Sequence, residues 1–334
     1  MPTPDDAILP FSLARSNMRG RVVRLDQTLQ TILDQHRYPP AVSALIAEAA
    51  LLTALIGQTM KLRWRFSLQV RGEGIVRMIA TDYFAPVAEG EPARIRAYAS
   101  FDRGEVASSR QTPFEMLGQG VIGITIDQGA DMRPYQGITP LSGQTLSHCA
   151  ETYFAQSEQI ATRFQMISAE VQEPGGAKHW RAGGIMLQQM PDSGGVAPDA
   201  PSGEHGLMSA DDVAEMGSRT EDWTRATTLL DTADAHELIG PTVSPETLLF
   251  RLFHEEVPSV FDAQPIEFGC TCSAEKVESA MYMYSAKDLT HMTTEDGKLT
   301  ADCQFCGAHY EFDPKTLGFE SEGSSQDEQP RLAE

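Results

Sequence analysis

The sequence predicts an α+β protein, with an N-terminal domain built on a largely antiparallel sheet with packed helices, a helical linker and a small C-terminal module held by four cysteines. Three observations support this prediction. Strand-like segments follow one another with few helices between them, a Gly- and Pro-rich stretch breaks the apolar pattern after residue 190, and four of the five cysteines fall within 37 residues near the C-terminus. The length of 334 residues is sufficient for a buried core and two domains.

Two helices are expected before the sheet segments. Apolar residues at i, i+4, i+7 and i+8 predict the first helix, and they are Leu25, Leu29, Ile32 and Leu33. The proline pair at 39–40 then introduces a second, Ala-rich helix that extends to about Lys61. We expect both helices to pack on the sheet.

The clearest strand begins near residue 63, where the apolar pattern changes to period two. Its apolar side chains are Trp64, Phe66, Leu68 and Val70, and polar residues that include three arginines alternate with them. Further segments with strand character lie at residues 75–80, 94–99, 121–126, 163–169 and 185–190. Because no regular helices separate these segments, we expect an antiparallel sheet and not a series of βαβ units.

The segment after the Gly- and Pro-rich stretch is strongly acidic, with ten acidic residues and two arginines in 199–237. A narrow apolar stripe nevertheless runs along it, formed by Trp223, Ala226, Leu230 and Ala233. Only Trp223 and Leu230 in this stripe are large, so we predict a marginal helix that is stable only while those two side chains dock onto another surface. A better-capped helix is expected at 244–253.

The clustered cysteines form two pairs, a C-x-C pair (Cys270 and Cys272) and a C-x-x-C pair (Cys303 and Cys306), with 30 residues between them. Zinc takes four thiolates in a tetrahedron at about 2.3 Å, and two short pairs let two loops supply the ligands, so we predict one Zn²⁺ per chain. Gly307 permits a tight exit from the second pair. The segment could not form a hydrophobic core of its own, so the metal would organise it.

Two other features predict no functional site. Cys149 shares a helical face with apolar neighbours, which predicts a buried and inert core thiol. The run His254-Glu255-Glu256 lacks the second histidine of a zinc-protease helix, so we expect a solvated helix end there.

Composition and the element predictions together define four regions. They are an α+β core domain in residues 1–190, a flexible acidic and helical linker in 191–262, a zinc-binding module in 263–318 and a disordered acidic tail in 319–334. The net charge of −21 predicts neither a nucleic-acid nor an anionic-membrane partner, because both need a positive surface. The start of the chain does not resemble a secretory signal, and the apolar stretch 41–57 is too short for a membrane span, so we expect a cytoplasmic protein.

The residues alone leave the role of the zinc open. A static zinc ribbon that serves as a protein-interaction module is the usual role of a four-cysteine site. However, two thiolate ligands with a single residue between them are close enough to form a disulfide. Oxidation of such ligands ejects the metal, which would make the site a redox switch. A thiol–disulfide oxidoreductase is a third alternative, but it needs a C-x-x-C at a helix start in a βαβ context, and that context is absent from the sequence.

The whole pattern resembles the redox-regulated heat-shock chaperone family of about thirty-three kilodaltons (heat shock protein 33). The resemblance rests on the order C-x-C then C-x-x-C with its long spacer. Four runs support it: YQGITPL at 135–141, YFAQSEQ at 153–159, AGGIMLQ at 182–188 and FRLFHEE at 250–256. The insert at 191–209 and the acidic tail extend beyond the family pattern.

The resemblance implies a stress-response holdase and not an enzyme. In that family the reduced, zinc-bound protein is inactive, and oxidation forms one disulfide within each pair, releases zinc and unfolds the module together with the linker. The exposed surface then holds unfolding client proteins without ATP, commonly as a homodimer. Carried over to this sequence, Cys270 pairs with Cys272 and Cys303 pairs with Cys306 in the oxidised protein.

Overall fold

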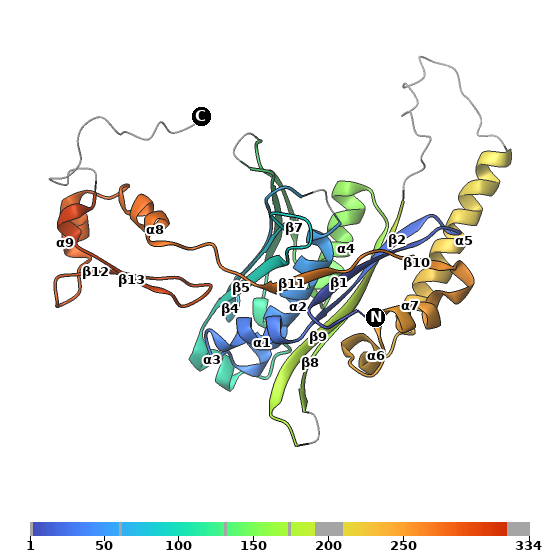
Figure 1. Cartoon of the computed structure of the whole chain (residues 1–334), viewed down its shortest axis with the longest axis horizontal. Coiled ribbons are helices and arrows are strands. Elements are labelled where there is room, and N and C mark those ends of the chain that lie inside the picture. The colour runs from blue at the N-terminus through green and yellow to red at the C-terminus, as the bar shows by residue number, and fades with distance from the viewer. Residues whose placement is uncertain (1–2, 60–61, 130–131, 173–174, 191–209, 319–334) are drawn as a thin grey trace, which may run out of the picture. The chain divides into compact units, whose positions relative to one another are not determined.

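The computed structural model describes residues 3–59, 62–129, 132–172, 175–190 and 210–318 (Figure 1). The chain divides into two compact units, Met1–Gly269 and Cys270–Glu334, and each is described by itself.

The first unit is an α+β domain with a largely antiparallel sheet, as predicted. Its strands are β1 (Ala7–Leu13), β2 (Met18–Leu25), β3 (Arg65–Gly72), β4 (Val76–Phe84), β5 (Ala93–Phe101), β6 (Gly120–Asp127), β7 (Tyr135–Pro140), β8 (Thr162–Gln172), β9 (Lys178–Gln189), β10 (Pro258–Val260) and β11 (Gln264–Phe268). The strand order is β7-β6-β3-β4-β5-β11-β1-β2-β9-β8, and β10 pairs with β1. Every pairing in this sheet is antiparallel except that of β11 with β5.

Strand β11 joins the two halves of this sheet. It lies antiparallel to β1, with Pro265 opposite Ala7, and parallel to β5, with Ile266 opposite Ala93. Just after it, the Gly269 amide donates a hydrogen bond to the carbonyl of Ile95 at 3.0 Å. The sequence analysis assigned residues 264–268 to the zinc module, whereas in the structure they form a strand of the first unit, and the division between units falls after Gly269.

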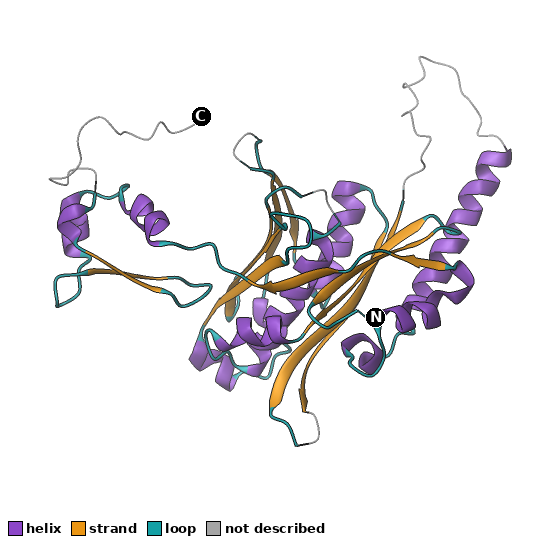
Figure 2. Ribbon diagram, viewed as in Figure 1, coloured by secondary structure: helices purple, strands orange, loops and turns teal. Residues whose placement is uncertain are grey.

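Helices cover both faces of the β1–β2–β9 part of the sheet (Figures 1 and 2). They are α1 (Gln27–Asp34), α2 (Pro40–Gly57), α3 (Arg103–Ser108), α4 (Leu146–Tyr153), α5 (Ala210–Asp231), α6 (Ala235–Ile239) and α7 (Pro245–Phe253), with short helical turns η1 (Glu115–Leu117), η2 (Phe154–Glu158) and η3 (His254–Glu256). Successive side chains of one strand point to opposite faces. Accordingly, Val23 packs with α1 and α2, while Val22 packs with α5, α6 and α7.

Helix α2 is the centre of the main core. Its 18 residues have a mean hydropathy of 1.8, which by length and composition would allow a membrane span, but 78% of them are buried inside the protein. The predicted first helix also exists, although Leu25 ends β2 and the helical stripe begins at Leu29 in α1. Leu25 was predicted to belong to the helix because an apolar residue at the end of a strand can continue the apolar spacing of the helix that follows.

The second unit contains four short regular elements and one helical turn. They are α8 (Ala274–Met281), α9 (Ala286–His291), a hairpin of β12 (Leu299–Asp302) and β13 (His309–Phe312), and η4 (Pro314–Thr316). Its hydrophobic cluster contains three buried residues, Leu289, Leu299 and Leu317, among those that the structure describes. Helix α8, whose side chains are all described, buries none of them. So few buried side chains cannot stabilise the fold of the 49 described residues without a cross-link such as a bound metal ion or a disulfide.

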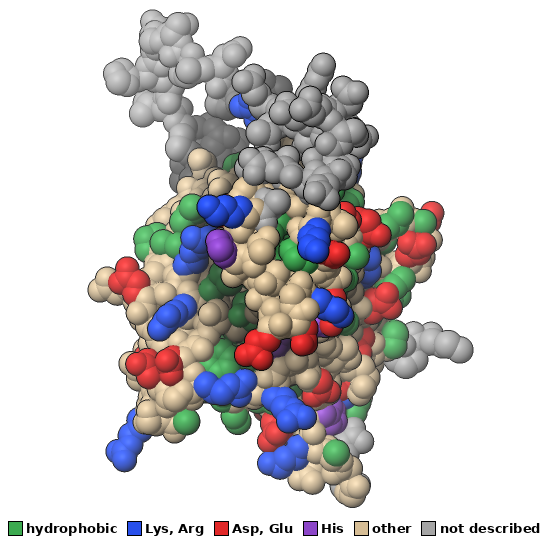
Figure 3. All heavy atoms as spheres, turned by 90° about the vertical axis from the view of Figure 1, so that its left-hand side faces the viewer, with side chains coloured by type: hydrophobic (Ala, Val, Ile, Leu, Met, Phe, Trp, Pro, Cys, Tyr) green, Lys and Arg blue, Asp and Glu red, His purple; other side chains and the backbone are tan. Residues whose placement is uncertain are grey.

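Charged side chains are interspersed with apolar ones over the face shown in Figure 3. Basic and acidic groups alternate there and do not form a patch of one sign. This face of the described protein therefore shows no single acidic binding surface.

Candidate functional site

The first cysteine pair lies in the loop between β11 and α8. Cys270 follows the last residue of β11 by two positions, and Cys272 immediately precedes Ser273, the N-cap of α8. The Ser273 hydroxyl accepts a hydrogen bond from the amide of Lys276 at 3.3 Å, which fixes the start of the helix. The Lys276 ammonium group donates to the carbonyl of Thr271, between the two cysteines. The C-x-C pair is thus held between a strand end and a capped helix.

The second pair lies in the loop of the β12–β13 hairpin. The Cys303 amide donates to the Ala308 carbonyl at 2.9 Å, and the Gly307 amide donates to the Cys303 carbonyl at 2.8 Å. Gly307 has a φ of 66°, which a glycine adopts at no steric cost. The sequence-based expectation that Gly307 allows a tight exit from this pair is therefore confirmed.

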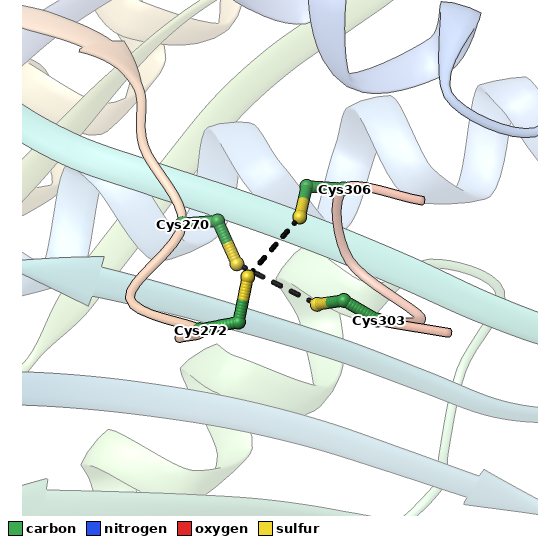
Figure 4. A group of neighbouring side chains, drawn as sticks. All are labelled: Cys270, Cys272, Cys303 and Cys306. Carbon is green, nitrogen blue, oxygen red and sulfur yellow. Dashed lines mark hydrogen bonds between the residues drawn. The ribbon is translucent and has the colours of Figure 1, made fainter. Parts of the chain in front are cut away.

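The four sulfurs form one group (Figure 4), and their atoms all lie within 4.8 Å of one another. The Sγ atoms of Cys270 and Cys303 are 3.7 Å apart, and those of Cys272 and Cys306 are 3.3 Å apart. Four thiolates bound to zinc at 2.3 Å stand about 3.8 Å apart at the corners of a tetrahedron. The four cysteines predicted as ligands could therefore hold a metal ion, and they come from two loops that are far apart in the sequence.

The electrostatic environment of the second pair suits a cation. Burial raises the pKa of the Cys303 thiol, although amide donors at Phe305 and Cys306 oppose this shift. Burial likewise raises the pKa of the Cys306 thiol. Without a cation, these partly buried sulfurs thus favour the neutral thiol, while a coordinated metal ion stabilises the thiolates. The donor set consists of soft sulfur ligands alone, which fits Zn²⁺ and not a hard cation such as Mg²⁺ or Ca²⁺.

One tyrosine contacts the first pair from the hairpin of the second. The Tyr310 hydroxyl donates a hydrogen bond to the Sγ atom of Cys272 at 3.1 Å. This contact raises the pKa of Tyr310 to about 12. The sequence did not predict this contact, since residues that are 38 positions apart share no local pattern.

The predicted docking residues of the linker, Trp223 and Leu230, lie on α5. Leu230 is 0% exposed, and Trp223 is half-buried against the same hydrophobic cluster. The sheet side of this cluster consists of Leu9, Phe11, Leu13, Met18, Val22, Ile185 and Leu187. The linker side also includes buried residues of α6 and α7, so the docked segment is longer than the acidic helix alone.

Buried arginines of the sheet fix the end of α6. Arg24 of β2 donates to the carbonyls of Leu238 at 3.0 Å and Val243 at 2.5 Å. Arg181 of β9 donates to the carbonyl of Ile239 at 3.3 Å. Cations at a helix C-terminus satisfy carbonyls that have no partner within the helix. These contacts give the linker a polar attachment in addition to its apolar one.

The run His254-Glu255-Glu256 is a solvated helix end at its first two residues, as expected, but not at Glu256. The Glu256 side chain is 2% exposed and accepts two hydrogen bonds from Arg225 of α5, at 2.9 Å and 2.6 Å. The other carboxylate oxygen of Glu256 is buried and has no hydrogen-bond partner in the structure. Sequence reasoning missed this pair because the two residues belong to separate helical elements, 31 positions apart.

Replacing Arg225 with glutamine should loosen the docking of α5. The change leaves the Glu256 carboxylate buried without its cation, and breaking a buried ion pair from one side is costly. Because the Arg225 side chain is 42% exposed, solvent screening reduces the effect, and we expect about a tenfold increase in hydrogen exchange over residues 220–231. Arg251→Gln is the matched control, since its pair with Glu237 is the more exposed one. Equal increases in both variants would contradict a special role for Arg225.

Cys149 is a buried core thiol, as predicted. It is 0% exposed on α4, and its Sγ atom donates to the carbonyl of Ser142 at 3.1 Å. Burial raises the pKa of Cys149, which keeps the thiol protonated and unreactive. It stands outside the group of four cysteines that could hold a metal ion.

Comparisons with known proteins agree with this arrangement. The profile of the family described as Hsp33 protein matches residues 6–313. The chain is 38% identical over 316 residues to a 33 kDa chaperonin of Caulobacter vibrioides, covering 93% of this chain and 95% of the relative. It is 34% identical over 307 residues to a 33 kDa chaperonin of Proteus mirabilis, covering 92% and 93%.

A solved structure shares the fold. The crystal structure of a 33 kDa chaperonin from Thermotoga maritima, a heat shock protein 33 homologue, matches with a TM-score of 0.70 at 19% identity. The match covers 92% of this chain and 95% of that one. The family profile and the curated relatives extend over nearly the whole sequence, from the sheet domain through both cysteine pairs. The chain therefore belongs to the Hsp33 family of chaperones.

Proposed function

We propose that this protein is a redox-regulated holdase that works without ATP and is not an enzyme. In the reduced state one Zn²⁺ is held by Cys270, Cys272, Cys303 and Cys306, and the chaperone is inactive. Oxidation forms two disulfides, releases the zinc and opens the linker, which uncovers a surface for unfolding proteins. The observation that carries this proposal is the group of four sulfurs in a unit whose hydrophobic cluster has three buried leucines.

With hydrogen peroxide as the oxidant, each cysteine pair loses two electrons to one peroxide molecule. A thiolate of the pair attacks one oxygen of the peroxide, the O–O bond breaks, and hydroxide leaves as a sulfenic acid forms. The second thiolate then attacks that sulfur and displaces another hydroxide, which completes the S–S bond. Two protons convert the two hydroxides to water. The chemistry thus removes two of the four metal ligands with each disulfide.

Chain connectivity supports a route from the zinc module to the linker. Strand β11 joins the two halves of the sheet and ends two residues before Cys270. Before it, β10 pairs with β1, and η3 supplies the Glu256 that binds Arg225 of α5. We infer that loss of order after Cys270 weakens β11 first and the Arg225–Glu256 contact next. Local opening of this kind spreads through the least stable neighbouring segments.

Release of the linker would uncover an apolar face of the sheet. The side chains beneath α5, α6 and α7 include Leu9, Phe11 and Leu187, which are buried only while these helices are docked. Unfolded or partly unfolded client proteins expose apolar segments that fit such a face. We expect the oxidised protein to act as a homodimer in the cytoplasm during stress, without nucleic-acid or membrane partners, and its net charge of −21 should keep it soluble while it holds a client.

Treatment with hydrogen peroxide and mild heat should release the zinc and start suppression of client aggregation. Disulfides are expected within the pairs, Cys270–Cys272 and Cys303–Cys306. The sulfur distances of 3.7 Å and 3.3 Å across the pairs do not favour this pattern by themselves. Once the module unfolds, however, only cysteines close in the chain stay near one another, because closing a longer loop costs more entropy. Zinc release, peptide mapping and a light-scattering assay of client aggregation measure the three effects.

The alternatives predict different results in the same experiment. A static zinc ribbon would keep its metal, or lose it without gaining holdase activity. A thiol–disulfide oxidoreductase would exchange disulfides with a substrate repeatedly and would not need to lose zinc. Disulfides that join the two pairs, or that include Cys149, would contradict the proposed switch.

A further inference from the structure

Tyr310 is placed between the two halves of the cysteine site. It lies on β13, opposite Ala301 of β12, in the hairpin whose loop carries Cys303 and Cys306. Its hydroxyl reaches the sulfur of Cys272, which belongs to the other pair. One side chain of the second pair's hairpin is therefore bonded directly to a ligand of the first pair.

The position of this hydroxyl is fixed by packing. The Tyr310 ring stacks on Phe312, with centroids 6.5 Å apart and planes 20° from parallel. Phe312 in turn packs against the cluster of Leu289, Leu299 and Leu317. The ring that carries the hydroxyl is thus connected through Phe312 to the hydrophobic cluster of the module.

When a sulfur is already a thiolate, as a zinc ligand is in the proposed function, a hydrogen bond to it reduces its reactivity toward a peroxide. The attacking electron pair belongs to the thiolate, and an O–H donor stabilises the same negative charge. The bond must weaken as the sulfur attacks and its charge passes to the departing hydroxide. A thiolate with such a donor therefore reacts more slowly than the same thiolate without it.

We propose that Tyr310 is a positioning residue that slows the oxidation of Cys272 and thereby sets the oxidant level at which the switch opens. The inference rests on the proposed function and concerns the first step of the oxidation, in which thiolate attack breaks the O–O bond of the peroxide, hydroxide leaves and a sulfenic acid forms. Slower oxidation of this sulfur reduces the rate of zinc release at low peroxide concentrations.

The test compares Tyr310→Phe with the wild type and with Tyr284→Phe. The phenylalanine keeps the ring that stacks on Phe312 and removes only the donor. Tyr284 is 42% exposed in the same unit and serves as the matched control. We expect peroxide to release zinc about three to ten times faster from Tyr310→Phe, as the loss of one hydrogen bond implies, with no change in Tyr284→Phe. An unchanged rate in Tyr310→Phe would overturn the proposal.

Two further measurements are needed. The first tests whether Tyr310 affects the reactivity of the sulfur or the retention of the metal, and the second tests the role of Tyr310 independently of the proposed function. Without oxidant, zinc transfer to a competing chelator should be the same in Tyr310→Phe and wild type. An equal acceleration there would mean that Tyr310 holds the site together, which would overturn the proposal. Alkylation by iodoacetamide, mapped by mass spectrometry, should be faster at Cys272 of Tyr310→Phe than at Cys272 of the wild type. The alkylation rate of Cys303 should be the same in both proteins. That result would support the role of Tyr310 even if peroxide failed to activate the chaperone, an outcome that would refute the proposed function alone.

Discussion

Replacing Cys303 with serine should abolish zinc binding, whereas Cys149→Ser should retain one zinc per chain. A serine hydroxyl stays neutral near pH 7 and is not a zinc ligand of the kind that structural sites use. Structural zinc contributes about 10–16 kcal/mol of apparent binding free energy in zinc-finger peptides, which is more than three buried leucines can replace. We therefore expect the Cys303→Ser variant to lose the order of residues 270–318 together with the metal.

Elemental analysis of the purified, reduced variants measures the zinc content, and hydrogen exchange measures the order of the module. Cys149→Ser is a strict control because this thiol is buried in α4 and stands apart from the cysteine group. Full zinc in Cys303→Ser, or loss of zinc from Cys149→Ser, would show that the ligands are not those assigned. A zinc-free variant with a protected β12–β13 hairpin would show that the metal is not what organises the module.

Sequence patterns predicted some strands well and missed others for physical reasons. Strand β3 was predictable because polar residues alternate with Phe66, Leu68 and Val70, which are all buried. Trp64, predicted to belong to the same apolar face, instead precedes the strand and is 49% exposed. By contrast, β1 and β2 were not predicted, since nearly all of β1 and the second half of β2 are buried on both faces. Strands β7, β10 and β11 were missed as well, because β7 is mostly exposed and the other two are short. Burial on both sides removes the period that identifies a strand.

The candidate site shows the same limit. The four cysteines were predictable because ligand type and spacing lie in the sequence itself. Two contacts were not predictable, because no local pattern connects residues so far apart in the sequence. Tyr310 is separated from Cys272 by 38 positions, and Arg225 is separated from Glu256 by 31 positions. Trp223 and Leu230 could be named from helical spacing, but the surface beneath them could not, because it consists of β1, β2 and β9.

Replacing Leu230 with aspartate should open the linker while the zinc stays bound. Leu230 is 0% exposed between α5 and the sheet, and burying a leucine contributes about 1.5–3 kcal/mol. A carboxylate at this position would have to lose its hydration, so undocking of the helix is the less costly outcome. Among the described side chains of α5, the remaining contacts are the small Ala226, the half-buried Trp223 and Leu229, and the ion pairs of Arg225 with Glu256 and of Asp231 with Arg163. We expect partial holdase activity in the reduced protein, and a smaller effect from Trp223→Asp because Trp223 is only half-buried.

Thr228→Asp is the matched control, since it adds the same charge to the same helix at an exposed position. Hydrogen exchange should increase over residues 220–231 in Leu230→Asp but not in Thr228→Asp, while β3 stays protected in both. Zinc analysis should give one metal per chain in each variant, so that any activity of Leu230→Asp arises from the linker and not from metal loss. If the helix opens and the reduced variant remains inactive, the sheet face under α5 is not the client surface. The zinc module would then have to unfold, or the chain would have to dimerise, before clients could bind.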